Sequence, residues 1–238
     1  MSLKVHRALL KMLREGPFGK RGKLPAEDIL ARQLGVSRNV LRDVLASLEA
    51  EGFITRRRGI GTMINQYVLD APSRLDLEKD FEEMIEEAGY RASLGLVTGG
   101  VIPAEEEVAK DLHLEVGEKV LKVEKLLLAD DRPAIYVLDY IPYRLIEGNP
   151  YTPEELKIPI FRFLKRKSQV KVEIVLMDVE PRLPDGIIAG MLGVEPSEPI
   201  MYVHEIGYSC TQTPVLLSQA YYRNGVFRLS ILRRNYLG

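Results

Sequence analysis

The 238-residue sequence lacks tryptophan and has a single cysteine, Cys210. One cysteine cannot form an internal disulfide, which excludes a disulfide-stapled scaffold and agrees with a reducing compartment. No run of about 18 apolar residues is present, so no membrane-spanning helix is predicted. The N-terminal stretch also lacks the continuous apolar core of a signal peptide. We therefore expect a soluble, cytoplasmic protein that has no membrane partner.

Histidine is scarce as well, and His6, His113 and His204 are scattered without the spacing of metal ligands. The sequence has no Gly-rich phosphate loop and no nucleophile elbow. His204 and Cys210 share parity on one expected strand, but about 20 Å would separate them along it, which excludes a direct dyad. A buried, inert cysteine is the favoured interpretation. We predict no catalytic residue, no metal site and no cofactor.

Charges of both signs nearly cancel over the chain, at a net charge of −1, but they are unevenly distributed. Residues 1–65 contain 13 Lys and Arg against 6 Asp and Glu, whereas the remainder contains 20 against 28. The first 65 residues therefore carry +7 and the rest −8. This basic head and acidic body indicate that the N-terminal part binds nucleic acid and that the remainder interacts with a protein or a small molecule.

Residues 24–65 predict two short helices followed by a hairpin, and an amphipathic helix over residues 3–14 precedes them. Leu24-Pro25 suits a helix start because proline lacks the N–H that would be unpaired there. Gly35 can take the left-handed conformation that ends the first helix, whose apolar face is Ile29, Leu30 and Leu34. The Ser37 hydroxyl can cap the second helix.

The second helix of this pair has a polar face with the chemistry of base recognition. Leu41, Val44, Leu45 and Leu48 recur at helical spacing and are expected to face the core. This spacing turns Arg38, Asn39 and Arg42 outward. Arginine can bind two acceptors of a guanine edge and asparagine can do the same for adenine, so this face predicts contact with the major groove of DNA.

A basic hairpin is expected directly after the second helix. Residues 53–55 predict a strand, Arg56, Arg57 and Arg58 approach a turn, and Gly59 and Gly61 supply the backbone freedom of a tight wing. An isolated arginine triplet is most often a solvated charge run. Next to a helix-turn-helix it instead predicts a wing that contacts the phosphate backbone or the minor groove.

The rest of the chain predicts a second domain. Residues 66–76 are expected to be a linker between a winged helix-turn-helix domain over 1–65 and a domain over 77–238, which begins with an acidic helix ending at Gly89. A weak repeat relates residues 112–118 to 192–198 at an offset of 80. Each copy is preceded by a short helix and followed by a strand, a polar turn, a proline (Pro133 or Pro214) and a second strand.

This repeat predicts the fold class α+β, with an antiparallel sheet built from two similar halves and helices on one side of it. A crevice between the halves is a natural small-molecule site.

Nearly all of the chain resembles GntR-family transcriptional regulators of the HutC type, whose C-terminal UTRA domain has a chorismate-lyase-like fold. The motifs that carry the resemblance are Leu24-Pro25-Ala26-Glu27, Leu34-Gly35-Val36-Ser37-Arg38, Leu48-Glu49-Ala50-Glu51-Gly52, Gly59-Ile60-Gly61-Thr62, Pro103-Ala104, Glu107-Val108-Ala109, Leu126–Asp131 with Pro133, Tyr140-Ile141-Pro142, Leu192-Gly193-Val194, Pro214-Val215 and Tyr222-Arg223. The resemblance implies a homodimeric repressor that binds a near-palindromic operator and responds to a metabolite.

The chain departs from this family at Asp28, where an arginine usually contacts DNA. We expect either that the Asp28 carboxylate caps the helix start or that the protein docks differently on DNA. Members that bind phosphorylated sugars have two arginines and a serine at positions that here are Lys125, Leu127 and Pro159, and an acidic residue where this chain has Leu216. We therefore expect a mainly apolar or aromatic effector with one anionic group for Lys125.

The predicted DNA-binding residues are Ser37, Arg38, Asn39, Arg42, Arg57, Arg58, Gly59 and Gly61, and the family layout implies effector contacts from Ser93, Lys125, Tyr140 and Tyr222. Two alternatives remain open at this point. The basic head could grip double-stranded DNA without sequence preference. Less favoured is a lyase-like enzyme that uses the C-terminal fold.

Overall fold

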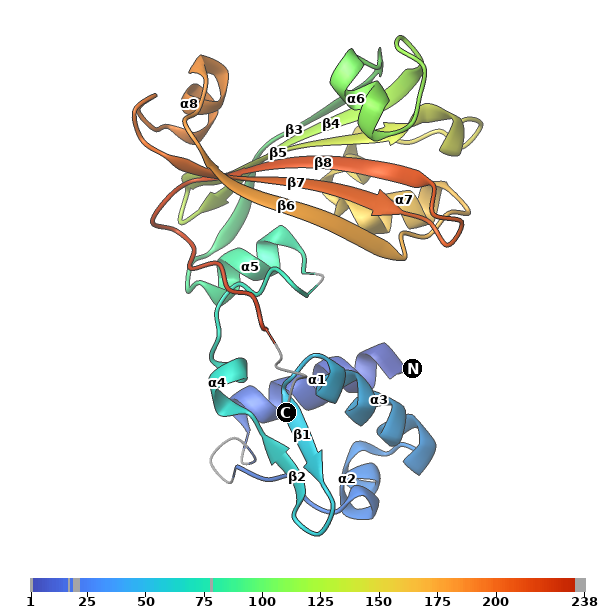
Figure 1. Ribbon diagram of the computed structural model, residues 1–238, viewed down its shortest axis with the longest axis vertical. Coiled ribbons are helices and arrows are strands. Elements are labelled where there is room, and N and C mark those ends of the chain that lie inside the picture. Colours follow the sequence, from blue (N-terminus) through green and yellow to red (C-terminus); the bar gives the residue numbers. More distant parts are fainter. Residues whose placement is uncertain (1, 17, 19–21, 78, 234–238) are drawn as a thin grey trace. The chain divides into compact units, whose positions relative to one another are not determined.

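The computed structural model describes residues 2–16, 18, 22–77 and 79–233, and the chain divides into two compact units (Figure 1). The N-terminal unit runs to Glu78 and also takes in the segment that starts at Leu229. The C-terminal unit spans Lys79–Arg228. Each unit buries an apolar core of its own.

The N-terminal unit contains the helices and the hairpin in the predicted order. Its elements are α1 (Ser2–Glu15), α2 (Glu27–Leu34), α3 (Arg38–Ala50), β1 (Ile54–Arg57), β2 (Gly61–Ile64) and α4 (Gln66–Leu69). Helices α1, α2 and α3 pack around one core that also receives buried residues of β1, β2 and α4. The winged helix-turn-helix that the sequence predicts is therefore present.

The turn between α2 and α3 forms as the sequence predicts. Gly35 has φ 65° and ψ 32°, a left-handed conformation that glycine adopts without steric cost. Its N–H donates to the Arg32 carbonyl oxygen at 3.2 Å. One expectation for α2 is wrong: Ile29 is 43% exposed, because Leu30 and Ala31 take the buried positions.

The predicted boundaries of the N-terminal unit differ from those of the structure. Residues 66–76 were expected to be a linker, but residues 66–69 form α4 and Leu69 is buried in the N-terminal core. The segment after residue 228 was expected in the second domain, yet it joins the N-terminal unit. Apolar contacts and backbone hydrogen bonds that no local pattern encodes cause both differences.

The C-terminal unit has a mixed helix and sheet structure. Its elements are α5 (Phe81–Glu87), β3 (Ala92–Pro103), α6 (Glu106–Asp111), β4 (Lys119–Ala129), β5 (Arg132–Pro142), the 3-10 helices η2 (Tyr143–Leu145) and η3 (Pro153–Lys157), α7 (Ile160–Lys167), β6 (Ile174–Arg182), α8 (Gly186–Leu192), β7 (Ile200–Tyr208) and β8 (Pro214–Tyr222). Strand, helix, strand, strand occurs twice in this order, as β3-α6-β4-β5 and β6-α8-β7-β8.

The two halves meet at the centre of one antiparallel sheet with the strand order β3-β4-β5-β8-β7-β6. Pro133 and Pro214 correspond at an offset of 81 residues. The same offset relates Leu138 to Gln219, which face each other between β5 and β8. The axis that relates the halves therefore passes through this pair, and the predicted repeat is a real feature of the fold.

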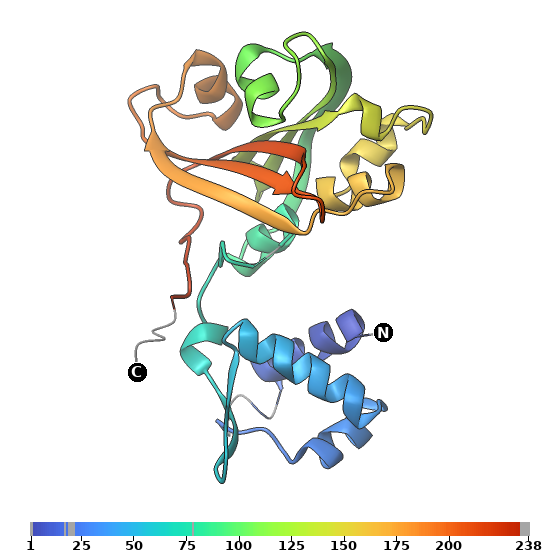
Figure 2. The same ribbon diagram turned by 45° about the vertical axis from the view of Figure 1, so that its right-hand side comes forward.

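Helices cover both faces of the sheet, whereas the sequence predicted helices on one side only. Helices α6 and α8 lie on one face, as Figures 1 and 2 show, and α8 packs over Tyr136, Tyr202 and Tyr221. Helix α5 lies on the other face, where Phe81 contacts Tyr222 with ring centroids 6.2 Å apart. On that same face α7 packs with η3 over Leu121 and other core residues. We call these the α6/α8 face and the α5/α7 face.

Candidate DNA interface and effector face

Helix α3 presents its predicted polar residues to solvent. Its N-terminus is capped by Ser37, whose Oγ accepts a hydrogen bond from the Val40 N–H at 3.3 Å. The buried side of α3 consists of Leu41, Val44, Leu45 and Leu48. Arg38, Asn39 and Arg42 are exposed. Within the described residues neither arginine forms an ion pair, so both guanidinium groups are available to an external acceptor.

A shallow groove runs along α3 beside the wing. It is lined by Asn39, Arg42, Asp43, Ala46 and Arg56. Arg56 belongs to β1, and Glu49 holds it in place: the two Glu49 carboxylate oxygens accept from the Arg56 backbone N–H and Nε, each at 2.7 Å. This contact fixes the wing against α3. The sequence had placed Arg56 only in the run that approaches the turn.

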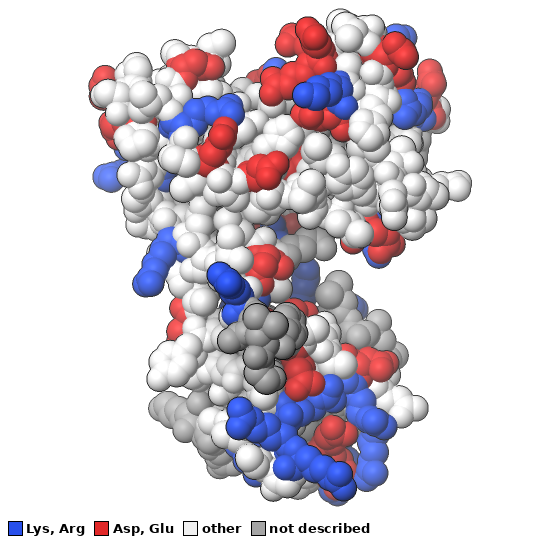
Figure 3. Space-filling view, in the orientation of Figure 1, with Lys and Arg blue, Asp and Glu red and all other residues white. Residues whose placement is uncertain are grey.

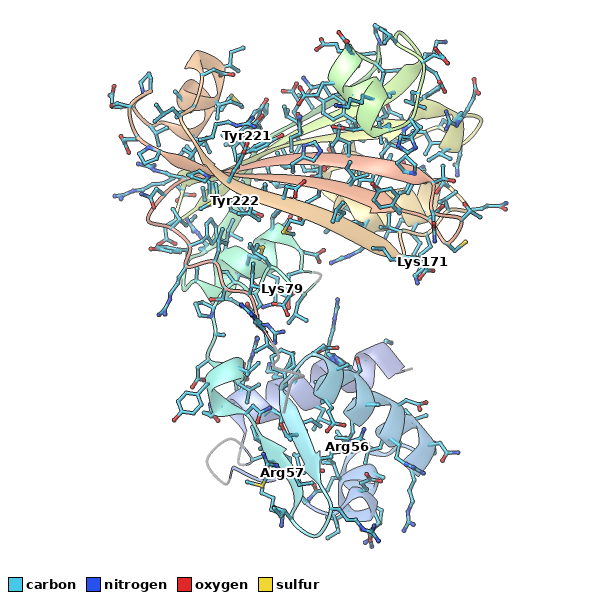
Figure 4. The ribbon with its side chains drawn as sticks, viewed as in Figure 1. Arg56, Arg57, Lys79, Lys171, Tyr221 and Tyr222 are labelled. Atoms are coloured by element: carbon cyan, nitrogen blue, oxygen red, sulfur yellow. The ribbon has the colours of Figure 1, made fainter. Side chains whose placement is uncertain are left out.

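The wing is an exposed, basic hairpin. Arg57 pairs with Gly61 at its end, and Gly59 and Gly61 have φ values of 80° and 106°, which close the turn. In the described part of the chain Arg57 and Arg58 have no ion-pair partner. Figure 4 shows Arg56 and Arg57 on this hairpin, and Figure 3 shows basic side chains gathered around it and α3. A surface of this kind can bind phosphate groups.

Lys23 adds a cation to the wing that the sequence did not single out. It forms an isolated bridge with Met63 of β2, and its side chain lies so close to Gly61 that a Cβ atom there would be 2.7 Å from the Lys23 Cε. Since Lys23 precedes the helix pair by several residues, no local motif connected it with the hairpin. Residues 22–24 run beside β2 and form backbone hydrogen bonds with it, and this pairing places Lys23 next to the wing.

Asp28, the departure from the family pattern, does not cap α2. Helix α2 has no side-chain cap. The Asp28 carboxylate instead pairs with Arg32 one turn further along, at 3.2 Å, and the Arg32 Nε also donates to the Asp28 carbonyl oxygen. This exposed pair neutralises the carboxylate locally, which lessens its repulsion of phosphate.

The four predicted effector residues do not lie together. Side chains alternate between the faces of a sheet, and Lys125 pairs with Val137 whereas Tyr140 pairs with Lys122. Tyr140 thus lies on the α6/α8 face, and Lys125 on the α5/α7 face. Tyr222 shares the face of Lys125; Figure 4 shows it on the opposite side of the sheet from Tyr221. Ser93 lies on the edge strand β3, opposite Leu128.

A row of polar side chains crosses the α5/α7 face next to Lys125. Asp139 pairs with Ser218 and Ser218 with Glu205 on three adjacent strands, and the Ser218 Oγ donates to Asp139 at 2.7 Å. Asp139 is 1% exposed and Lys125 is 4% exposed. The Lys125 Nζ donates to the Ile158 carbonyl oxygen at 2.6 Å. We call Lys125, Asp139, Ser218 and Glu205 the polar row.

Burial governs the electrostatics of this row. It lowers the pKa of Lys125, although Asp139, Glu82 and Asp80 oppose the change. It raises the pKa of Asp139 to about 6 against the opposing effects of Lys125 and Ser218. It also raises the pKa of Glu205 to about 7, and the charge of Asp139 adds to this rise. The row therefore combines one buried cation with two carboxyl groups that resist ionisation.

The residues considered for catalysis lie outside this row. Cys210 is exposed, which contradicts the buried cysteine expected from the sequence. It follows the end of β7, in the turn before β8. His204 pairs with Asp111 of α6 at 3.2 Å and so lies on the other face. Among the described residues no cluster of His, Cys, Asp and Glu could hold a metal ion, and no described helix is long and apolar enough to cross a membrane.

A capped helix beside a basic wing, joined to a domain with a two-fold repeated antiparallel sheet, defines a winged-helix DNA-binding protein with a second, ligand-binding type of domain. Comparison with protein families agrees. The family described as "Bacterial regulatory proteins, gntR family" matches residues 1–64, and the family described as "UTRA domain" matches residues 87–228. The chain belongs to the GntR family of transcriptional regulators with a C-terminal UTRA domain, as the sequence motifs predicted.

Relatives match most of the chain, and solved structures share its fold. The transcriptional regulator GgaR of Escherichia coli (strain K12) is 23% identical over 94% of this chain and 88% of its own length. The transcriptional repressor NagR of Bacillus subtilis (strain 168) is 23% identical over 90% and 87%. The crystal structure of YydK from Bacillus subtilis covers 98% of this chain and 99% of its own, with 17% identity and a TM-score of 0.76. PhnF from Mycobacterium smegmatis covers 97% and 99%, with 21% identity and a TM-score of 0.60.

Replacement of Arg38 by alanine is predicted to weaken binding to the specific DNA site by about 1 to 3 kcal/mol and to relax specificity at one base position. Replacement of Arg57 should weaken binding to all sequences alike and reduce the salt slope by about one. Fluorescence anisotropy with specific and random duplexes at several salt concentrations measures both. Lys171→Ala, in the C-terminal unit, is the control and should change neither. If Arg38→Ala bound the specific site normally, the assignment of α3 as the recognition helix would be wrong.

The substitution Glu205→Gln is predicted to stabilise the protein at pH 8. Because the folded-state pKa of Glu205 is raised from 4.5 to about 7, its contribution to stability is full below pH 4.5 and is lost as the pH rises through 7. The variant should gain roughly 1 to 3 kcal/mol at pH 8 and little at pH 4.5. Urea unfolding at both pH values measures the difference. Glu147→Gln, an exposed control, should be neutral, and equal effects at both pH values would contradict the prediction.

Proposed function

We propose that this protein is a transcriptional repressor that binds a two-fold-symmetric operator as a homodimer. Its affinity for DNA changes when a small molecule binds the C-terminal unit. It acts through binding alone, without catalysis. The observation that carries the proposal is the groove along α3, where Asn39, Arg42 and Arg56 face outward next to the unpaired wing arginines. That NagR is named a repressor and matches most of the chain supports the repressor role.

The geometry of the N-terminal unit supports each DNA contact in this proposal. Arg38, Asn39 and Arg42 read or clamp the major groove from the first turns of α3. Arg57 and Arg58 contact phosphates from the wing, where glycine permits close approach of the backbone. Those glycines are Gly59 and Gly61. Ser37 contributes by capping α3, and its hydroxyl is exposed at the helix end that meets DNA.

A homodimer gives the operator its symmetry. One winged unit contacts only a few base pairs, and two copies related by a two-fold axis contact two half-sites in opposite orientation. The affinities of the half-sites then combine, because the second unit binds as part of the same molecule.

The effector that we propose is small and mainly apolar or aromatic, with one anionic group that faces Lys125. Leu127 and Leu216, which stand where phosphate-binding members have polar residues, are buried on the same face as Lys125. Tyr222 supplies an aromatic surface there. In the polar row, the Asp139 carboxylate can accept a hydrogen bond from a hydroxyl or amine of the ligand. Ser93 borders this region only from the edge strand, and we place Tyr140 outside the site.

Selection of bound duplexes from a random DNA pool tests the proposed function directly. Purified full-length protein is used without added ligand. Recovery of one short two-fold-symmetric sequence, bound at least about a thousandfold more tightly than random duplex, is the expected result. Recovery of bound DNA without a common motif would support the alternative of a non-specific DNA-binding module. Dimer formation is measured on the same sample by sedimentation.

Titration with two classes of small molecule tests the effector class. Sugar phosphates such as glucose 6-phosphate should not bind at micromolar strength, because the face that carries Lys125 has leucine at positions that hold polar groups in phosphate-binding members. Arylalkanoic acids such as 3-phenylpropionate should bind more tightly, and Lys125→Met should remove this preference. Micromolar binding of a sugar phosphate by calorimetry would contradict the proposal.

A further inference from the structure

Residues 229–233 are paired with the segment that leaves the winged domain. Residues 229–233 lie beside residues 73–76 within the N-terminal unit (Figures 1 and 2). The Ser230 N–H donates to the Ser73 carbonyl oxygen at 3.2 Å, and the Leu75 N–H donates to the Ser230 carbonyl oxygen at 2.9 Å. These two bonds form a parallel bridge between Arg74 and Ser230. The two segments are about 155 residues apart in sequence, so only the tertiary structure brings them together.

Arg74, between these bonds, is attached to the end of the recognition helix. It is 2% exposed, and its Nη1 donates to the Glu51 carbonyl oxygen at 2.7 Å, at the C-cap of α3. Its guanidinium carbon lies 5.1 Å from the centre of the Phe53 ring. A cation at the C-terminal end of a helix is favoured by the helix dipole, and stacking on an aromatic face adds to the attraction.

Asp76 connects this anchor with the end of the chain. Its carboxylate accepts hydrogen bonds from the Arg74 guanidinium, one of them 3.0 Å from Nε to Oδ1. The same Oδ1 accepts from the Leu232 N–H at 3.3 Å. Burial alone would raise the pKa of Asp76, but the bonds from Arg74 and Leu232 hold it below its usual value. The carboxylate is therefore charged at neutral pH.

Within the C-terminal unit, the two chain segments that lead to the N-terminal unit both contact the ring of Tyr222. Phe81, just after the first crossing, contacts the Tyr222 ring with centroids 6.2 Å apart. Phe227, just before the second crossing, contacts it at 5.7 Å. Tyr222 is 3% exposed and lies on the α5/α7 face. A displacement of its ring would therefore act on both connecting segments together.

We propose that residues 229–233 are a clasp that fixes segment 73–76 to the end of α3, so that two paired segments, and not a single linker, join the UTRA domain to the recognition helix. The hydrogen bonds that form the clasp lie within the N-terminal unit and involve no ligand. Its role in transmitting a signal from the α5/α7 face rests on the proposed function.

Two truncations of the full chain test the clasp. A variant that ends at Arg228 lacks it, and a variant that ends at Arg233 keeps every hydrogen bond described above. Hydrogen exchange followed by mass spectrometry is measured over residues 73–76. The shorter variant should exchange at least about tenfold faster there than the full chain, and the longer variant should match the full chain. Equal exchange in all three proteins would overturn the clasp.

A pair of point variants guards against general misfolding of the truncated protein. Ser230→Pro removes the N–H that donates to Ser73, whereas Ser230→Ala removes only the hydroxyl. The proline variant should reproduce the faster exchange and the alanine variant should not. Faster exchange in both variants, or in neither, would contradict the role of the backbone bonds.

The selected operator duplex then tests the connection to DNA binding. Ser230→Pro should change operator affinity at least about threefold relative to Ser230→Ala, because α3 loses its fixed attachment. Unchanged affinity together with fast exchange would mean that the clasp forms but does not control α3. If selection yields no operator, the proposed function fails, while the exchange measurements still decide whether the clasp exists.

Discussion

The pairing of β5 with β8 is the contact on which the C-terminal unit depends. It joins the two repeated halves through the Leu138 and Gln219 pair, and all nine residues of β8 are buried. A shift of one residue in this register would move every side chain of one half to the opposite face. The polar row would then be broken, because Asp139 and Ser218 meet only in the observed register. The location of the polar row is thus a consequence of how the halves pair.

The N-terminal unit depends on a comparable set of contacts at the two ends of α3. Ser37 caps its first turn, and Arg74 binds the carbonyl oxygen at its last. Glu49, between them, holds Arg56 of the wing. Helix and wing are therefore positioned as one rigid surface, which is what recognition of DNA requires, since base contacts are lost when side chains shift by about an ångström. The electrostatic attraction supplied by Arg38, Arg42, Arg57 and Arg58, which form no ion pair within the described residues, acts on this prepared surface.

Local patterns predicted the head well and the second domain less completely. Helix ends, the turn at Gly35 and the basic hairpin are encoded by neighbouring residues, so they could be identified from the chain. Strands β3 and β6 were missed because each is an edge strand without a buried residue, and neither shows the alternation of a half-buried strand. The placement of helices on both faces was missed because the repeat includes α6 and α8 but not α5 or α7.

The sequence by itself determined the order of the three helices and the wing of the head, the basic character of the head and the family, because caps, glycines, apolar periodicity and charge act between near neighbours. Only the tertiary structure decided which residues share a site. Strand register placed Tyr140 away from Lys125 and put Asp139 beside Ser218, and long-range backbone bonds returned the end of the chain to Arg74. These contacts join positions up to 156 residues apart, and their free energy comes from burial that no local segment achieves alone.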